Sequence, residues 1–218
     1  MHLHPEVLFY YMELHITDEI SSLKAVVLGI ATSNGPIPKP EDAYDPKSLQ
    51  HILAGTYPKE ADMVAQMEEV AQVLKRYGVE VYRPEVLEDY NQIFARDISF
   101  VIDDKIIIAN ILPDRKREVE ATEYVWITVD KSKRIILPDE CHVEGGDVMP
   151  WGEYLLVGTY RGDDYPDYIT ARTNMEAVNA LQELFPERKV VSFNLKKSNT
   201  DPLNSALHLD CCFQPLGR

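Results

Sequence analysis

Short apolar runs separated by turn-forming residues predict a regular succession of strands and helices along this chain. The run Lys24–Ile30 is short and β-branched, and a loop rich in Ser, Asn, Gly and Pro follows it, which is typical of a buried strand. From Pro58, apolar residues recur at helical spacing up to Gly78, a residue type that commonly ends helices. Val79–Tyr82 is then a second strand. The apolar face of the helix, which we expect in the core, comprises Met63, Met67, Val70, Ala71 and Leu74.

The segment Thr32–Tyr57, which lies between the first strand and this helix, has little periodicity. Loops of that length without secondary structure are usually functional lids or are disordered. We therefore expect a lid or a disordered segment here.

The rest of the chain repeats one order of elements: a β-hairpin, a helix and a further strand. The hairpins have apolar arms around short polar or Gly-containing turns, and Asn174 is suited to cap the second helix. A third hairpin is expected at Ala206–Phe213. The predicted elements are the hairpin Ile98–Ala109, the helix Asp114–Trp126, the strand Arg134–Leu137, the hairpin Val148–Val157, a helix with the apolar face Met175, Val178, Leu181 and Leu184, and the strand Val190–Leu195.

This order recurs roughly every 50–60 residues, a period that indicates structural repeats. Each unit begins with a stretch that carries acids, at Phe94–Asp97, Glu144–Asp147 and His208–Asp210. If the units surround a common axis, their equivalent positions converge on one central pocket. The sequence contains no linker that would divide it, so we expect a lead-in over residues 1–23 and a single α/β domain over residues 24–218.

Composition narrows the possible partners. The formal net charge of −14 offers no basic patch to displace counterions from phosphates, so nucleic acid is excluded as a partner, and a cationic substrate is favoured. Three cysteines, two of them adjacent at Cys211 and Cys212, form no disulfide framework, so we expect a reducing cytoplasm. The apolar run Val7–Tyr11 is too short for a signal peptide or a membrane span.

The converging stretches combine one imidazole with four carboxylates. A planar guanidinium fits such a site because its five N–H donors match carboxylates in bidentate fashion. His208 beside the acids is suited to act as general acid and base, and Phe94 to cover one face of the cation. The candidate residues are Asp97, Glu144, Asp147, His208 and Asp210.

A metal site is the alternative interpretation. His142 with Glu144, and His208 with Asp210, each place an imidazole two residues from a carboxylate, but the HExxH and CxxC spacings are absent. We therefore expect no metal. We expect His142 to be a solvated or hydrogen-bonded loop histidine. We expect Arg96 to be a structural ion-pair partner.

Four motifs in order resemble the guanidino-group-modifying enzymes, the superfamily of arginine deiminases, dimethylarginine dimethylaminohydrolases and glycine amidinotransferases. They are Asn91–Asp97 (Asn-Gln-Ile-Phe-Ala-Arg-Asp), Glu144–Asp147, Arg172–Asn174 and His208–Asp210. The resemblance implies a pentein fold, an α/β-propeller of five ββαβ units around a pseudo-fivefold axis, incomplete at the C-terminus of this chain. It also implies no cofactor and a small arginine-like substrate; a homo-oligomer is possible.

The resemblance further implies a role for each site residue. Asp97 and Asp210 would bind the substrate guanidinium, Glu144 would orient His208, and His208 would protonate the leaving amine and then activate water. Three more residues have implied roles: Phe94 in substrate binding, Asp147 as a supporting acid, and Arg172 as a partner of the substrate α-carboxylate or as a helix-start ion pair.

The family's nucleophilic cysteine lies in its final unit, so we expect it beyond Arg218 in a longer chain. Cys211 and Cys212 follow His208 too closely for that role, and as strand neighbours we expect both to be packing residues. Three functions remain open: hydrolysis of arginine-like substrates, slightly preferred because Glu stands at position 144; amidino transfer to an amine; and non-catalytic binding.

Overall fold

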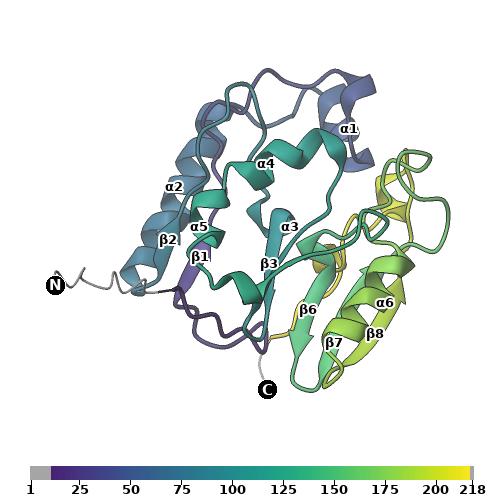
Figure 1. The fold of residues 1–218 in the computed structure, drawn as a ribbon. Helices are drawn as coiled ribbons and strands as arrows, with labels where there is room; N and C mark the ends of the chain where they lie inside the picture. The colour runs from purple at the N-terminus through teal and green to yellow at the C-terminus, as the bar shows by residue number, and fades with distance from the viewer. Residues whose placement is uncertain (1–10, 217–218) are drawn as a thin grey trace, which may run out of the picture.

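The computed structural model describes residues 11–216, which form a mixed α/β structure with three small sheets (Figure 1). In the first sheet, β1 (Ala25–Val27) pairs in parallel with β2 (Glu80–Tyr82), and α2 (Glu60–Arg76) connects them. Gly78, with a φ of +76°, ends the helix as predicted.

The apolar face of α2 is less buried than expected. Ala71 is its one fully buried residue, Met63 and Met67 are half-buried, and Val70 is exposed. The prediction of a core face is therefore wrong for Val70 and only partly met by Met63, Met67 and Leu74, because α2 packs beside a sheet of only two strands.

The segment expected to be a lid or disordered contains secondary structure. It forms a 3-10 turn at Pro40–Asp42 and the helix α1 (Pro46–Leu53). The side chain of Asp45 accepts hydrogen bonds from the backbone N–H groups of Lys47 and Ser48, and Pro46 occupies the first helical position. Asp followed by Pro is a helix-start signal that a search for periodicity overlooks in so short a helix.

The second sheet has the predicted order. In it β3 (Ser99–Ile102) pairs antiparallel with β4 (Lys105–Ile108), which pairs in parallel with β5 (Arg134–Ile136). A short helix, α3 (Ala95–Ile98), precedes β3. The single helix expected before β5 is instead divided into α4 (Lys116–Glu120) and α5 (Glu123–Trp126).

The division between α4 and α5 follows from Thr122. Its hydroxyl donates to the Val119 carbonyl at 2.9 Å, and its ψ of 5° interrupts the helical geometry. Such back-bonding by Thr competes with the helical hydrogen bonds.

The third sheet repeats the second. In it β6 (Val148–Trp151) pairs antiparallel with β7 (Tyr154–Thr159), which pairs in parallel with β8 (Lys189–Asn194). The helix α6 (Met175–Leu184) lies over β7 and β8 in Figure 1. Its cap is confirmed, since Asn174 accepts from the Ala177 N–H at 3.0 Å. Two ββαβ units therefore stand side by side.

The main core lies between these two sheets and α6. It joins residues of both units, so each unit buries its apolar face against the other. Its fully or nearly buried members are Ile102, Ile107, Leu137, Cys141, Val143, Val148, Leu155, Val157, Ala177, Val178, Leu181 and Phe185.

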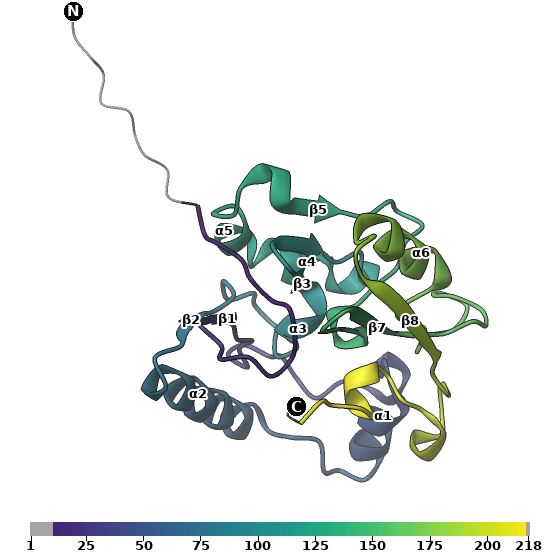
Figure 2. The ribbon, with the colours of Figure 1, turned by 90° about the horizontal axis from the view of Figure 1, so that it is seen from below.

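The hairpin predicted at Ala206–Phe213 is wrong. The segment forms a 3-10 turn at Leu209–Cys211, and the preceding 3-10 turn, Pro202–Asn204, lies beside α1 (Figure 2). The Leu209 N–H is bonded to the buried Asp147 carboxylate at 2.8 Å rather than to a neighbouring strand. Both Cys211 and Cys212 are exposed, so the prediction that they pack in the interior is wrong as well.

No helix within residues 11–216 is long and apolar enough to cross a membrane.

Arg188 ties the hairpins of the two units together. Its buried guanidinium donates to Asp103 in the β3–β4 turn and to the carbonyls of Gly152 and Tyr154 at the β6–β7 turn.

We expect Arg188→Met to lower the free energy of unfolding by about 2 kcal/mol, because it leaves these acceptors without a donor. Urea denaturation measures this. The neighbouring Lys189→Met removes an exposed pair with Glu153 and a cation–π contact with Tyr154, and is expected to cause a much smaller change. Equal effects would contradict this role of Arg188.

Candidate functional site

Three short turns that share one closing hydrogen bond build the site. Each is closed by an N–H bonded to the carbonyl three residues earlier: Asp97 to Phe94 at 3.1 Å, Asp147 to Glu144 at 3.0 Å, and Cys211 to His208 at 3.2 Å. The first two directly precede β3 and β6. The turn at Glu144 contacts both of the others. The predicted convergence of the three acid-bearing stretches is therefore present in the structure.

The glycine pair between Glu144 and Asp147 allows this contact. A Cβ on Gly145 would lie 2.0 Å from the Arg96 carbonyl oxygen, and one on Gly146 would lie 2.9 Å from Cγ of His208. No side chain fits in either position without moving the neighbouring turn. These glycines serve close approach of backbone and imidazole.

His208 and Glu144 form the centre of the site. The His208 Nε2 donates to Oε2 of Glu144 at 2.7 Å, and its Nδ1 lies 3.9 Å from Oδ1 of Asp97. Glu144 has no exposed surface, and His208 and Asp97 are buried as well. Burial alone would lower the pKa of His208, but contacts with the Cys211 thiol and Glu144 and the charge of Asp97 raise it well above its ordinary value. These surroundings therefore favour the protonated form of the imidazole.

The charge of Glu144 is balanced by three cations. Besides His208, Arg172 donates to Oε1 at 3.3 Å and Arg115 to Oε2 at 3.2 Å. Burial would raise the pKa of Glu144, but the His208 hydrogen bond and the arginine charges outweigh it and lower this pKa. Arg172 also donates to the Tyr44 carbonyl at 3.0 Å. Arg172 is thus an ion-pair partner of Glu144, and its role toward a substrate carboxylate stays a prediction.

Asp147 braces the turns from behind. It accepts from the Thr173 hydroxyl at 2.7 Å and from the Leu209 N–H at 2.8 Å. Burial raises its pKa to about 6. Asp147 therefore links the turn before β6 to the segment that carries His208, as expected for a supporting acid.

Arg115 and Glu118 are site residues that the sequence analysis missed. The Arg115 guanidinium donates to Asp97 at 3.0 Å and forms a bidentate pair with the buried Glu118 at 2.8 and 2.9 Å. No motif distinguishes them. Their Arg-x-x-Glu spacing in a predicted helix is the one available signal, and such pairs are common on helix surfaces.

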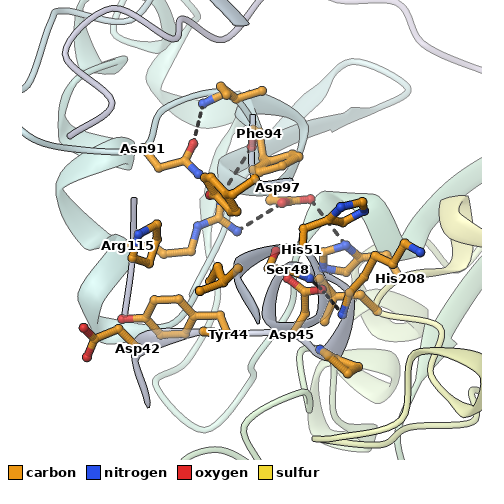
Figure 3. A pocket seen from close by; sticks show the side chains of 18 of the residues that line it. Asp42, Tyr44, Asp45, Ser48, His51, Asn91, Phe94, Asp97, Arg115 and His208 are labelled. Carbon is orange, nitrogen blue, oxygen red and sulfur yellow. Dashed lines mark hydrogen bonds and ion pairs between the residues drawn. The ribbon is translucent and has the colours of Figure 1, made fainter. Parts of the chain in front are cut away.

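A pocket of about 910 Å³ adjoins the site and is lined by Asp97, Arg115, Glu118, Arg172 and His208. Figure 3 shows Phe94, Asp97, Arg115 and His208 along part of its wall, with Tyr44 and Ser48 from the segment around α1 facing them. Phe94 is 57 % exposed and lines the cavity, as do Arg96, Asp210 and Cys211. The segment that the sequence presented as a lid is thus one wall of the site.

His142 lies apart from this pocket. It bonds Asp164 at 2.8 Å in a loop, which confirms the prediction of a hydrogen-bonded loop histidine. Arg96 forms ion pairs with Glu19 at 3.2 Å and Asp210 at 3.4 Å, as expected of an ion-pair partner.

Two groups of donor atoms in the described part of the chain could hold a divalent ion. In each, the atoms lie within 4.8 Å of one another, and His208 belongs to both: one adds Asp210 and Cys211, the other Asp97 and Glu144. In the second group the carboxylates are already paired with His208, Arg115 and Arg172, which favours an ion-pair cluster over a metal site.

A family model described as "Arginine deiminase" matches residues 86–217, more than half of the chain. The chain belongs to the arginine deiminase family. The matched range contains both complete ββαβ units and all three turns. The family resemblance inferred from the four motifs is therefore confirmed.

A curated relative is "Uncharacterized protein YkgA" of Bacillus subtilis, which is 29% identical over 150 residues. The match covers 68% of this chain and 46% of the relative, so the chain spans less than half of that protein's length.

Two solved structures show the fold. Dimethylarginine dimethylaminohydrolase from Pseudomonas aeruginosa, a mutant complexed with citrulline, is 16% identical with a TM-score of 0.57, over 82% of this chain and 63% of that one. The inosamine-phosphate amidinotransferase StrB1 from Streptomyces griseus is 15% identical with a TM-score of 0.60, over 86% and 64%. The fold of this family member is of the pentein type.

The buried His208–Glu144 pair predicts a specific dependence of stability on pH. Because the pKa of His208 is higher in the folded state than its ordinary value of 6.5, this residue stabilises the fold fully below pH 6.5. The contribution falls by about 1.4 kcal/mol per pH unit as the pH rises toward the folded-state pKa. We expect chemical denaturation between pH 6 and 9 to show this loss in the parent protein and not in His208→Gln. Equal slopes for the two proteins would contradict a protonated His208.

Proposed function

We propose that this protein acts on the guanidino group of arginine or a substituted arginine and that it is a hydrolase. The observation that carries the proposal is the buried 2.7 Å contact between His208 and Glu144, with Asp97 beside the imidazole in a pocket that other acids line. An imidazole with a raised pKa is suited to give a proton to a leaving amine and take one from water.

The substrate guanidinium would lie between Asp97 and Asp210, which offer carboxylate oxygens to its planar N–H groups. Phe94, exposed at the pocket wall, would cover one of its faces. Glu144 would hold the imidazole in place and stabilise its positive charge, and Asp147 would support the turn from behind. Arg172 lines the pocket, and its guanidinium has N–H donors beyond those bonded to Glu144 and the Tyr44 carbonyl that would meet a substrate carboxylate.

The proposed reaction begins with attack of a cysteine thiolate on the guanidinium carbon. A carbon–nitrogen bond then breaks, and the leaving amine takes the proton of His208. Water, deprotonated by His208, attacks the resulting thiouronium, and the carbon–sulfur bond breaks to release a urea-type product such as citrulline. We propose that the cysteine lies beyond Arg218, as the family resemblance implies.

An amidinotransferase is the second candidate, in which an amine takes the place of water. The fold does not separate the two functions, because the similar structures include a hydrolase and a transferase. Glu144 in the Glu-Gly-Gly-Asp turn favours the hydrolase.

Substrate binding is testable on this chain. We expect isothermal titration calorimetry to show arginine binding, and Asp97→Asn to weaken it roughly 10- to 100-fold, because a charge-assisted hydrogen bond is lost. Asp163→Asn, which changes an exposed carboxylate, is the matched control. Thermal unfolding checks that each variant is folded. Unchanged affinity in Asp97→Asn would contradict the proposed guanidinium site.

The choice between hydrolysis and transfer is testable on the protein expressed from its own gene. The hydrolase proposal expects citrulline from arginine without any added amine. Strict dependence on glycine or another amine would instead assign the protein as an amidinotransferase, while arginine binding without any product would indicate a binding protein.

A further inference from the structure

The two carboxylates proposed to bind the substrate are each paired with an arginine of the chain itself. Arg115 donates to Asp97 at 3.0 Å, and Nε of Arg96 lies 3.4 Å from Asp210. Both arginines line the pocket. The described structure therefore presents two guanidinium groups at the positions that a substrate guanidinium would need.

Each of these arginines has a second carboxylate partner. Arg115 forms its bidentate pair with Glu118, and Arg96 donates to both oxygens of Glu19, at 3.2 and 3.3 Å. Neither Glu118 nor Glu19 belongs to the proposed substrate contacts. An arginine that releases Asp97 or Asp210 thus stays paired and close to its present position.

The Arg115 environment shows that this part of the site is built for a guanidinium. Its donors meet Glu118 twice, Asp97, Glu144 and, at 3.4 Å, the Phe94 carbonyl. Three buried carboxylates and a carbonyl therefore surround one planar cation. A second guanidinium at Asp97 competes with Arg115 for this carboxylate, whose Oδ2 accepts from Arg115.

We propose that substrate binding is an exchange of guanidinium groups, in which Arg96 and Arg115 yield Asp210 and Asp97 to the substrate and are retained by Glu19 and Glu118. This inference rests on the proposed function. It makes the four residues determinants of affinity and specificity without direct contact with the substrate.

The exchange explains discrimination between cations. A guanidinium replaces the planar donors that it displaces, whereas a compact ammonium offers a different geometry and is more strongly hydrated. Alkylammonium ions are therefore poor competitors at this site, although the acids alone would attract any cation.

The Arg96 half of the exchange is the one to test. Arg115 and Glu118 are buried, and removal of either leaves a buried charge that destabilises the fold. The Arg96 side chain is 42% exposed, and beyond its two ion pairs its replacement loses only a long hydrogen bond to the Val148 carbonyl, at 3.4 Å. Arg96→Met frees Asp210, and Glu19→Gln removes the retaining charge while keeping the side-chain shape.

The proposal predicts effects of opposite sign on arginine affinity, measured by titration calorimetry. Arg96→Met is expected to bind arginine about two- to fivefold more tightly, and Glu19→Gln about two- to fivefold more weakly, the range of a partly exposed ion pair. Methylammonium should show no binding to either variant. Arg83→Met and Glu68→Gln, which remove an ion pair of 2.8 Å outside the pocket, are the matched controls and should change nothing.

Other outcomes are equally decisive. If both variants bind arginine more weakly, Arg96 contacts the ligand directly and the exchange is wrong. If neither variant changes the affinity, the exchange is also wrong. In both cases the proposed function stands. Binding in Arg96→Met alone, with none in the parent protein, would support the exchange strongly. Absence of arginine binding in the parent protein and in every variant would overturn the proposed function and the exchange together.

Discussion

The site depends on one fully buried carboxylate, that of Glu144. A buried charge is costly unless cations and hydrogen bonds compensate it. Its three partners, His208, Arg172 and Arg115, come from different parts of the chain. Compensation of Glu144 therefore holds the third turn, the start of α6 and the start of α4 against the centre of the molecule. The same contact with Glu144 raises the pKa of His208, so the stability of the site and its proposed chemistry have a common origin.

The three turns of the site carry different side chains at equivalent positions. Phe94, Glu144 and His208 occupy the start of equivalent turns, and the closing position of the turn is Asp97, Asp147 or Cys211. Because each turn is closed by the same kind of hydrogen bond, its first and fourth residues lie at equivalent positions. The fold thus assembles an aromatic ring, a carboxylate and an imidazole around one pocket from three copies of a simple element.

Although the chain is acidic, the carboxylates of the site are not left without positive partners. Arginines accompany the acids of the site, from Arg96 at the rim to Arg115 and Arg172 in the interior. Buried acids need such partners to stay ionised, and ionised acids are what a guanidinium ligand requires. Under the proposed function, binding is then a change of partners within a neutralised cluster, and affinity depends on how firmly each internal arginine is held elsewhere.

Local patterns in the sequence determined the sheets and the family. Apolar runs and turn residues predicted the hairpins of both units, and Asn174 predicted the start of α6, because these features act between near neighbours. Tertiary contacts decided the rest. The turn at Leu209–Cys211 replaces a predicted strand because a distant carboxylate, Asp147, accepts a hydrogen bond from its backbone. The helix α2 stays largely exposed because the sheet beside it has only two strands. Arg115 and Glu118 belong to no motif; only the folded chain brings an arginine 18 residues from Asp97 onto that carboxylate.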